Sequence, residues 1–206
     1  HITFQKPLMV KNAGWEAMEA WWIDGTPSDC AKFGLLSLEG PEPELVISGI
    51  NEGCNLGTDV HYSGTVAAAM EAAFMGKPAI AVSAPHRAEE EAFQLAADEA
   101  LALAERLRQN PLPAHTVLNL NVPRCAPEAV QGRVAAPLAF IPYEFTMEER
   151  KHPFGFPYYW SMFSPKRNQH PGNNDVTWNE RGYITYTVLG WDLTLQEQTK
   201  GFLPEE

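Results

Sequence analysis

The stretch ELVISGINEGCNLGTDVHYSGTVAAAMEAAFMGKPAIAVS, residues 44–83, determines the fold class that we predict for this chain. It starts with a short apolar run, Leu45–Ile47, which is typical of a buried parallel strand. A polar loop with glycines follows, and then an alanine-rich segment, 66–75, whose high helix propensity stops at Gly76. A second apolar run occupies 79–83. The stretch therefore predicts one strand–helix–strand crossover with an enlarged first turn.

The loop before the predicted helix is the best candidate for a binding site. Ligands of open parallel sheets bind beyond the carboxyl ends of the strands, and a helix N-terminus offers N–H groups and partial positive charge to a phosphate. Ser63, Gly64 and Thr65 are therefore candidates for holding an anion. Asn51 offers a neutral oxygen that a hard divalent cation accepts. From the residues alone, Ser63 is as readily an ordinary helix cap and Asn51 a turn residue.

Several segments of this region form a longer pattern. The ranges are Ser48–Asn51, Asn55–Gly57, Tyr62–Glu71 and Gly76–Ser83. Together they resemble the signature of the SurE family of metal-dependent 5'/3'-nucleotidases. Leu118–Pro123 is similar to a later strand of that family, and weaker similarity continues to Trp191–Thr194.

The resemblance implies an activity and roles for particular residues. It implies hydrolysis of nucleoside 5'- and 3'-monophosphates with a divalent metal, Mg or Mn, in a homodimer or homotetramer. Asn51 would be a metal ligand, while Asn55, Ser63, Gly64 and Thr65 would hold the substrate phosphate. Asp175 becomes a weak candidate, because the family has a similar loop near its site. Otherwise, a single Asp among Asn and Gly residues is a turn former.

The resemblance also concerns the start of the chain. Family members begin with a strand that ends in two adjacent aspartates, followed by a serine-bearing loop, and these supply most of the metal ligands. Neither matches a segment of this sequence. We therefore expect the N-terminal strand–helix unit to be missing from these residues, and this chain to be an incomplete form whose catalytic competence is open.

Composition restricts the partners and the setting. The 206 residues carry a formal net charge of −11, which does not favour a nucleic-acid polymer as partner. The scattered cysteines Cys30, Cys54 and Cys125 form no disulfide framework or zinc pattern, and so favour a reducing, cytoplasmic setting. No apolar run has the length of a membrane span, and no basic-then-apolar leader opens the chain, so we expect no membrane partner.

The remaining core elements follow from local patterns. Residues 1–10 alternate as a strand interrupted at Pro7, and the tryptophans of 15–23 suggest a surface hairpin whose rings pack on the core. Asn119 and Asn121 could reach a site at the end of their strand, but we expect buried amides with hydrogen-bond partners. A helix should start at Thr26. Further elements are expected as a helix over 87–109 and strands over 116–122 and 182–189.

From residue 132 the composition changes to dense aromatics and prolines. This pattern predicts an extended β-hairpin arm, whose apolar side would pack against another subunit. The expected architecture is α/β: a Rossmann-like, mostly parallel sheet flanked by helices, with a C-terminal hairpin arm. We divide it into a core, 1–131, and a region, 132–206, that contains the arm, the final strand and an acidic tail for oligomerisation.

Two other classes of function stay open. One is a non-catalytic SurE-like module that binds phosphate or serves assembly, and that would show no dependence on divalent ions. The other is a different α/β enzyme, such as a nucleotide-dependent transferase, although the sequence has no convincing motif for recognising a base or sugar. Nor does any Ser/His/Asp or Cys/His arrangement indicate nucleophilic catalysis.

Overall fold

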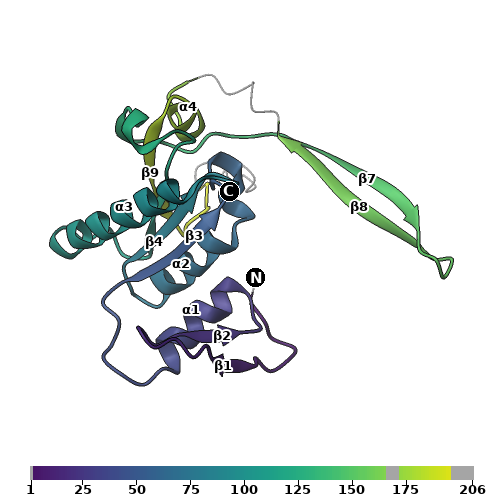
Figure 1. The fold of residues 1–206 in the computed structure, drawn as a ribbon, viewed down its shortest axis with the longest axis horizontal. Coiled ribbons are helices and arrows are strands. Elements are labelled where there is room, and N and C mark those ends of the chain that lie inside the picture. Colours follow the sequence, from purple (N-terminus) through teal and green to yellow (C-terminus); the bar gives the residue numbers. More distant parts are fainter. Residues whose placement is uncertain (1, 166–171, 196–206) are drawn as a thin grey trace, which may run out of the picture.

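The computed structural model describes residues 2–165 and 172–195, and its centre is a five-stranded sheet (Figure 1). The strand order is β3-β4-β5-β9-β6. β3, β4 and β5 run parallel, whereas β9 runs antiparallel to β5 and parallel to β6. The expected α/β class with a mostly parallel sheet is thus confirmed. The strands are β3 (Val46–Glu52), β4 (Ala79–Ala84), β5 (Thr116–Asn121), β6 (Gly132–Ala135) and β9 (Tyr183–Gly190).

Helices cover the two faces of this sheet. The side chains of β4 alternate: Ile80 and Val82 pack in one apolar cluster with α3 (Glu90–Gln109), while Ala79 and Ala81 pack in another with α2 (Gly64–Phe74). All four side chains are fully or almost fully buried. A strand that is apolar on both faces requires a helix on each, so the β4 sequence itself specifies a three-layer arrangement.

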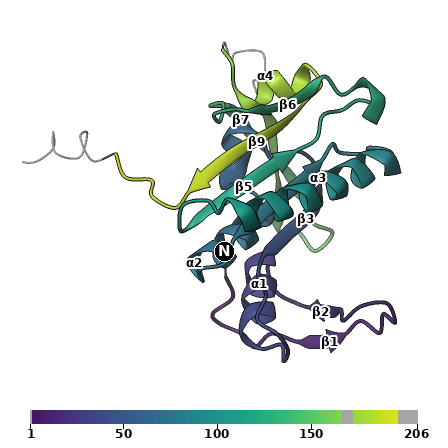
Figure 2. The same ribbon diagram turned by 90° about the vertical axis from the view of Figure 1, so that its left-hand side faces the viewer.

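The N-terminal part forms a small unit beside α2 (Figure 2). It consists of the antiparallel pair β1 (Val10–Asn12) and β2 (Trp21–Ile23), and of α1 (Pro27–Leu36), which begins at the predicted cap. The strand predicted over 1–10 is wrong, because β1 begins only at Val10. In place of a ladder, the Thr3 N–H and hydroxyl bind the Asp29 carboxylate at 2.9 and 2.6 Å.

The tryptophans of this hairpin do not pack on the core as expected. Trp15, Trp21 and Trp22 are all exposed. Trp21 makes an edge contact with Phe33 of α1, and the Lys11 ammonium lies over the Trp22 ring. The rings of Trp21 and Trp22 thus contact side chains of the N-terminal unit itself.

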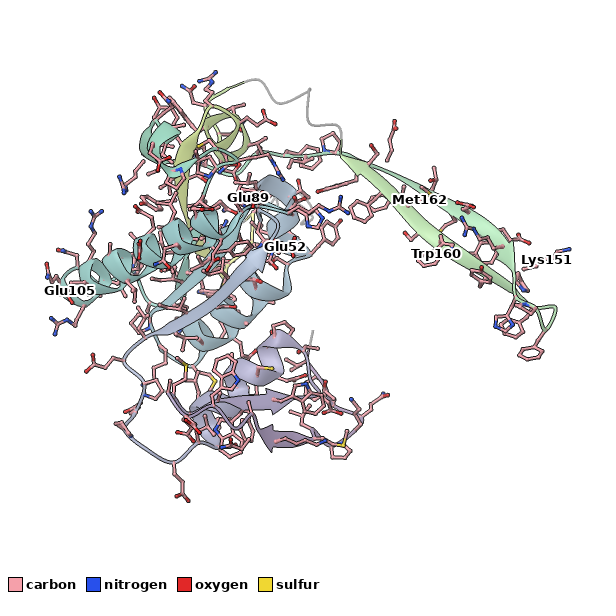
Figure 3. All side chains as sticks on the ribbon, in the orientation of Figure 1. Glu52, Glu89, Glu105, Lys151, Trp160 and Met162 are labelled. Atoms are coloured by element: carbon pink, nitrogen blue, oxygen red, sulfur yellow. The ribbon has the colours of Figure 1, made fainter. Side chains whose placement is uncertain are left out.

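The hairpin β7 (Tyr143–Lys151) and β8 (Pro157–Pro165) projects far from the sheet, as Figure 1 shows. This confirms the predicted arm. Large side chains such as Trp160 and Met162 stand out from it into open space (Figure 3). A two-stranded ribbon has little core of its own, so a partner surface would add to its stability.

Two local predictions need correction. β3 continues through Asn51 to Glu52, where a loop was expected from residue 48, and the loop itself contains a 3-10 turn, η1 (Gly57–His61). Asp175 was expected in a turn-rich loop over 170–175, yet it opens the short helix α4 (Asp175–Glu180). Residues 170 and 171 of that loop, and the tail after 195, lie outside the described residues.

Candidate functional site

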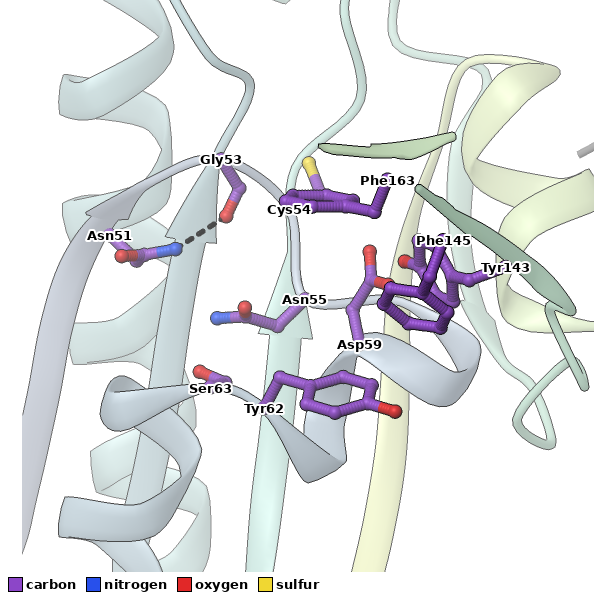
Figure 4. A pocket seen from close by; sticks show the side chains of 10 residues that line it. All are labelled: Asn51, Gly53, Cys54, Asn55, Asp59, Tyr62, Ser63, Tyr143, Phe145 and Phe163. Carbon is purple, nitrogen blue, oxygen red and sulfur yellow. Dashed lines mark hydrogen bonds between the residues drawn. The ribbon is translucent and has the colours of Figure 1, made fainter. Parts of the chain in front are cut away.

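A pocket lies where the C-terminal end of β3 meets the N-terminus of α2 (Figure 4). Its volume is about 420 Å³. One side is polar and comes from the end of β3 and the β3–α2 connection, whereas the other consists of rings from the root of the arm together with Tyr62. The lining residues are Asn51, Gly53, Cys54, Asn55, Asp59, Tyr62, Ser63, Tyr143, Phe145 and Phe163.

Asn51 and Ser63 line the same pocket although they belong to different elements. The Asn51 amide nitrogen donates to the Gly53 carbonyl at 2.6 Å, which orients the side chain and leaves its Oδ1 as acceptor. Ser63 is the N-cap of α2, and its Oγ accepts from the Val66 N–H at 3.1 Å. The Ser63 hydroxyl hydrogen is thus directed elsewhere, and it can donate to an anion.

Asn55 is held by side chains from the two central parallel strands. Its N–H donates to Asn121 Oδ1 at 2.7 Å, and its carbonyl accepts from the amides of Asn119 and Asn121 at 2.9 and 3.1 Å. Its own amide donates to Ser83 Oγ at 2.8 Å. Both amides are therefore buried as expected, and both donate to the loop that lines the pocket. The expectation of full hydrogen bonding holds for Asn121 but not for Asn119, because the Asn119 Oδ1 has no partner within the described residues.

Asp175 does not line the pocket and is fully buried. Its carboxylate accepts from the backbone N–H of Gly57 at 2.7 Å and of Ala139 at 2.8 Å. Burial raises the pKa of this carboxyl above the ordinary range, and the backbone donors offset part of that rise. The side chain thereby fastens the start of η1 to the segment that leads into the arm.

Gly57 shows why this junction is so close. Its φ of 54° lies in the left-handed region, and a Cβ at this position would come within 2.5 Å of the Ala139 carbonyl oxygen. Next to it, Thr58 Oγ1 accepts from the Ile141 N–H at 2.7 Å. The η1 turn and the arm root are therefore one packed unit.

Gly64 and Thr65 open α2 but are not among the side chains that line the pocket. A Cβ on Gly64 would come within 2.9 Å of Pro27 Cγ, so this glycine permits close packing of α1 on α2. The part of these two residues that could reach an anion is the backbone N–H at the helix N-terminus.

The sequence reasoning did not find the aromatic side of the pocket. Tyr62 makes an edge contact with Tyr143, whose ring in turn contacts Phe145 and Phe163. The density of aromatic residues after residue 140 is the one sequence signal for this side of the pocket, but from the sequence it predicts subunit contacts. The position of the arm root beside η1 could not be read from that density.

The described residues do not fit a preformed divalent-metal centre. In residues 2–165 and 172–195, no group of three or more His, Cys, Asp or Glu side chains is placed to hold a metal ion. The pocket offers the Asn51 oxygen and one carboxylate, Asp59. Hard divalent cations take six or more oxygen ligands and bind tightly only when several are anionic.

Fold and site together define an α/β domain whose pocket lies at the carboxyl ends of parallel strands and at a helix N-terminus. The model of the family described as Survival protein SurE matches residues 1–143. This chain belongs to the SurE family.

Relatives and a solved structure support this assignment over most of the chain. The 5'-nucleotidase SurE of Synechococcus sp. (strain JA-3-3Ab) is 41% identical over 196 residues, covering 94% of this chain and 75% of that protein. That of Geotalea daltonii is 40% identical, covering 94% and 77%. The crystal structure of the SurE protein from Aquifex aeolicus matches with a TM-score of 0.79 and 33% identity, over 98% of this chain and 81% of that one.

Proposed function

We infer that this chain is a nucleotidase that hydrolyses nucleoside 5'-monophosphates to nucleoside and phosphate. The SurE relatives that carry the name 5'-nucleotidase support this inference. The observation that carries it in this chain is the meeting of Asn51 and Ser63 in one pocket. Cleavage of 3'-monophosphates belongs to the proposal as well.

We propose that the phosphate binds on the polar side of the pocket. There the N-terminus of α2, including Gly64 and Thr65, faces it with N–H groups and partial positive charge. The Ser63 hydroxyl and the second amide hydrogen of Asn55 add side-chain donors. The clamp from Asn119, Asn121 and Ser83 fixes Asn55 before the substrate arrives, so little ordering cost falls on binding.

Dependence on a divalent metal, Mg or Mn, is part of the proposal, and Asn51 is the ligand that we assign to it. Such an ion neutralises phosphoryl oxygens and activates water when it is bound. Since the described donor set is short of anionic ligands, we expect the 206-residue chain to bind the free ion weakly.

The test is phosphate release from a nucleoside 5'-monophosphate by this chain across a Mn titration, with and without chelator. Asn51→Ala should raise the Mn concentration needed for half-maximal rate, and a chelator should abolish the activity. Asn110→Ala, at the end of α3, is the matched control. Activity that survives chelation, or an Asn51→Ala protein with an unchanged Mn requirement, would refute the metal role.

The non-catalytic alternative gives a different result. It predicts that a nucleotide binds without phosphate release at any Mn or Mg concentration. The proposal has three further parts. They are a homodimer or homotetramer built through the arm, a division into a core of 1–131 and an assembly region of 132–206, and a cytoplasmic setting. None of the helices in the described ranges combines the length and apolar character of a membrane span.

A further inference from the structure

The aromatic side of the pocket has no role in binding a phosphate. Four rings, Tyr62, Tyr143, Phe145 and Phe163, line it. In Figure 4 the rings of Tyr143, Phe145 and Phe163 lie on the side away from Asn51 and Ser63, and Tyr62 extends towards them from beside Ser63. The pocket is thus divided into a polar part and an aromatic part, and a nucleoside monophosphate has the same division between its phosphate and its base.

The rings present open faces rather than closed packing. The side chains of Phe145 and Phe163 are 60% and 66% exposed, and Tyr62 is 68% exposed. Tyr143 contacts each of the other three rings at centroid distances between 5.9 and 6.2 Å. Tyr143 therefore holds the group together, while its neighbours keep surface free for a flat ligand.

We propose that these four residues, the base wall, stack on the nucleobase of the substrate. This inference rests on the proposed function and adds a specificity element to it. Stacking on aromatic rings accepts any base, because every base has a π-face. The wall therefore favours nucleotides over phosphate esters that lack a base, and discriminates little among the bases.

The position of the wall is fixed relative to the phosphate side. Three of its rings come from the arm root, and that root is bound to η1 through Asp175 and through Thr58. η1 itself leads into the N-cap of α2, Ser63. Base and phosphate would thus be recognised by two surfaces at a set separation.

The experiment compares two substrates and one phosphate-free ligand on the full 206-residue chain. The substrates are adenosine 5'-monophosphate and ribose 5-phosphate, assayed for phosphate release with Mn. The ligand is adenosine, whose affinity is measured at equilibrium by NMR titration. The variants are Phe163→Ala and Phe163→Trp. Phe154→Ala is the control, since Phe154 is 86% exposed on the same arm and does not line the pocket.

Phe163→Ala should weaken adenosine binding and raise the KM for adenosine monophosphate by about 10-fold, which is the effect of losing one stacking partner. The KM of Phe163→Ala for ribose 5-phosphate should stay within about twofold of the wild-type value. Phe163→Trp, which keeps an aromatic ring, should bind the nucleotide as tightly as the wild type. Equal loss for both substrates, or no change for adenosine, overturns the base wall.

The two proposals can fail separately. If the wild-type protein cleaves neither substrate but Phe163→Ala binds adenosine more weakly than the wild type, the base wall stands and the nucleotidase proposal falls. If both substrates are cleaved with no effect of Phe163→Ala on either, the nucleotidase stands and the base wall falls.

Discussion

Removal of the Asp175 side chain should destabilise the contact between η1 and the arm root more than it destabilises the central sheet. Asp175→Ala deletes the acceptor of two N–H groups that lie far away in sequence, those of Gly57 and Ala139. It also deletes the local acceptor of the Val176 N–H at 2.9 Å. No water reaches this position easily, because Asp175 is fully buried.

The expected cost follows from these contacts. A hydrogen bond to a charged group contributes about 1.5–3 kcal/mol, so two long-range bonds would amount to about 3–6 kcal/mol. Burying the carboxylate is itself unfavourable, as its raised pKa indicates, and removal of the charge recovers part of the loss. We therefore expect Asp175→Ala to lower the free energy of unfolding by about 2–4 kcal/mol. Asp175→Asn keeps one oxygen acceptor without charge and should cost about half as much.

Urea unfolding followed by circular dichroism measures the total loss, and amide hydrogen exchange locates it. Exchange should accelerate at Gly57 and Ala139 more than in β4, because their donors lose the shared acceptor. Asp192→Ala is the control: Asp192 is an exposed aspartate whose bond, to the Thr194 N–H at 2.8 Å, is purely local.

A free energy of unfolding of Asp175→Ala within about 0.5 kcal/mol of the wild type, with unchanged protection of the Gly57 amide, would contradict the role of Asp175, since that is the effect of an ordinary surface substitution. A stability loss without faster exchange at Gly57 or Ala139 would also contradict it.

Three other substitutions test the supports of the site and of the fold. Asn121→Leu removes both bonds to the Asn55 backbone, and should cost about 1–3 kcal/mol in thermal unfolding and raise the KM for nucleotide; an unchanged KM would separate Asn55 from substrate binding. Burial acts to raise the pKa of Asp29, but the bonds from threonine donors outweigh it and hold the pKa well below the ordinary range. This group therefore contributes stability above about pH 4 that is lost as the pH falls towards its folded pKa. In Asp29→Asn, the free energy of unfolding should fall less steeply below about pH 4 than in the wild type. Equal slopes for the two proteins would contradict the role of Asp29. Glu99→Ala leaves Arg133 and the Tyr186 hydroxyl without their acceptor and should cost about 1–3 kcal/mol in urea unfolding; Glu99→Gln keeps an oxygen acceptor without the charge and should cost less, and equal losses would contradict a contribution from the hydrogen bonds.

The central crossover was predictable because its signals are local. The apolar runs, the helix propensity of 64–74 and the cap at Ser63 each depend on neighbours in sequence. The clamp on Asn55 could be predicted only in part: two asparagines on a strand indicate buried amides with partners, but only the fold shows which carbonyl they bind.

The errors have physical causes too. Residues 1–10 alternate like a strand, yet the bonds of Thr3 to Asp29 replace a ladder, and no pattern within ten residues reveals so distant a partner. α4 has only six residues, too few for a helical period to show. The base wall joins Tyr62 to rings of the arm, and such a contact depends on topology rather than on spacing.

The arm root serves at once as a side of the pocket and as the base of the projecting hairpin. A partner that binds the hairpin and shifts its root would change the affinity for a ligand lying against Tyr143 and Phe163. By thermodynamic linkage, a ligand bound in the pocket must change the affinity of that partner for the hairpin by the same factor. For such a partner, the ligand concentration at half-saturation would depend on the partner concentration, and the reverse would hold equally.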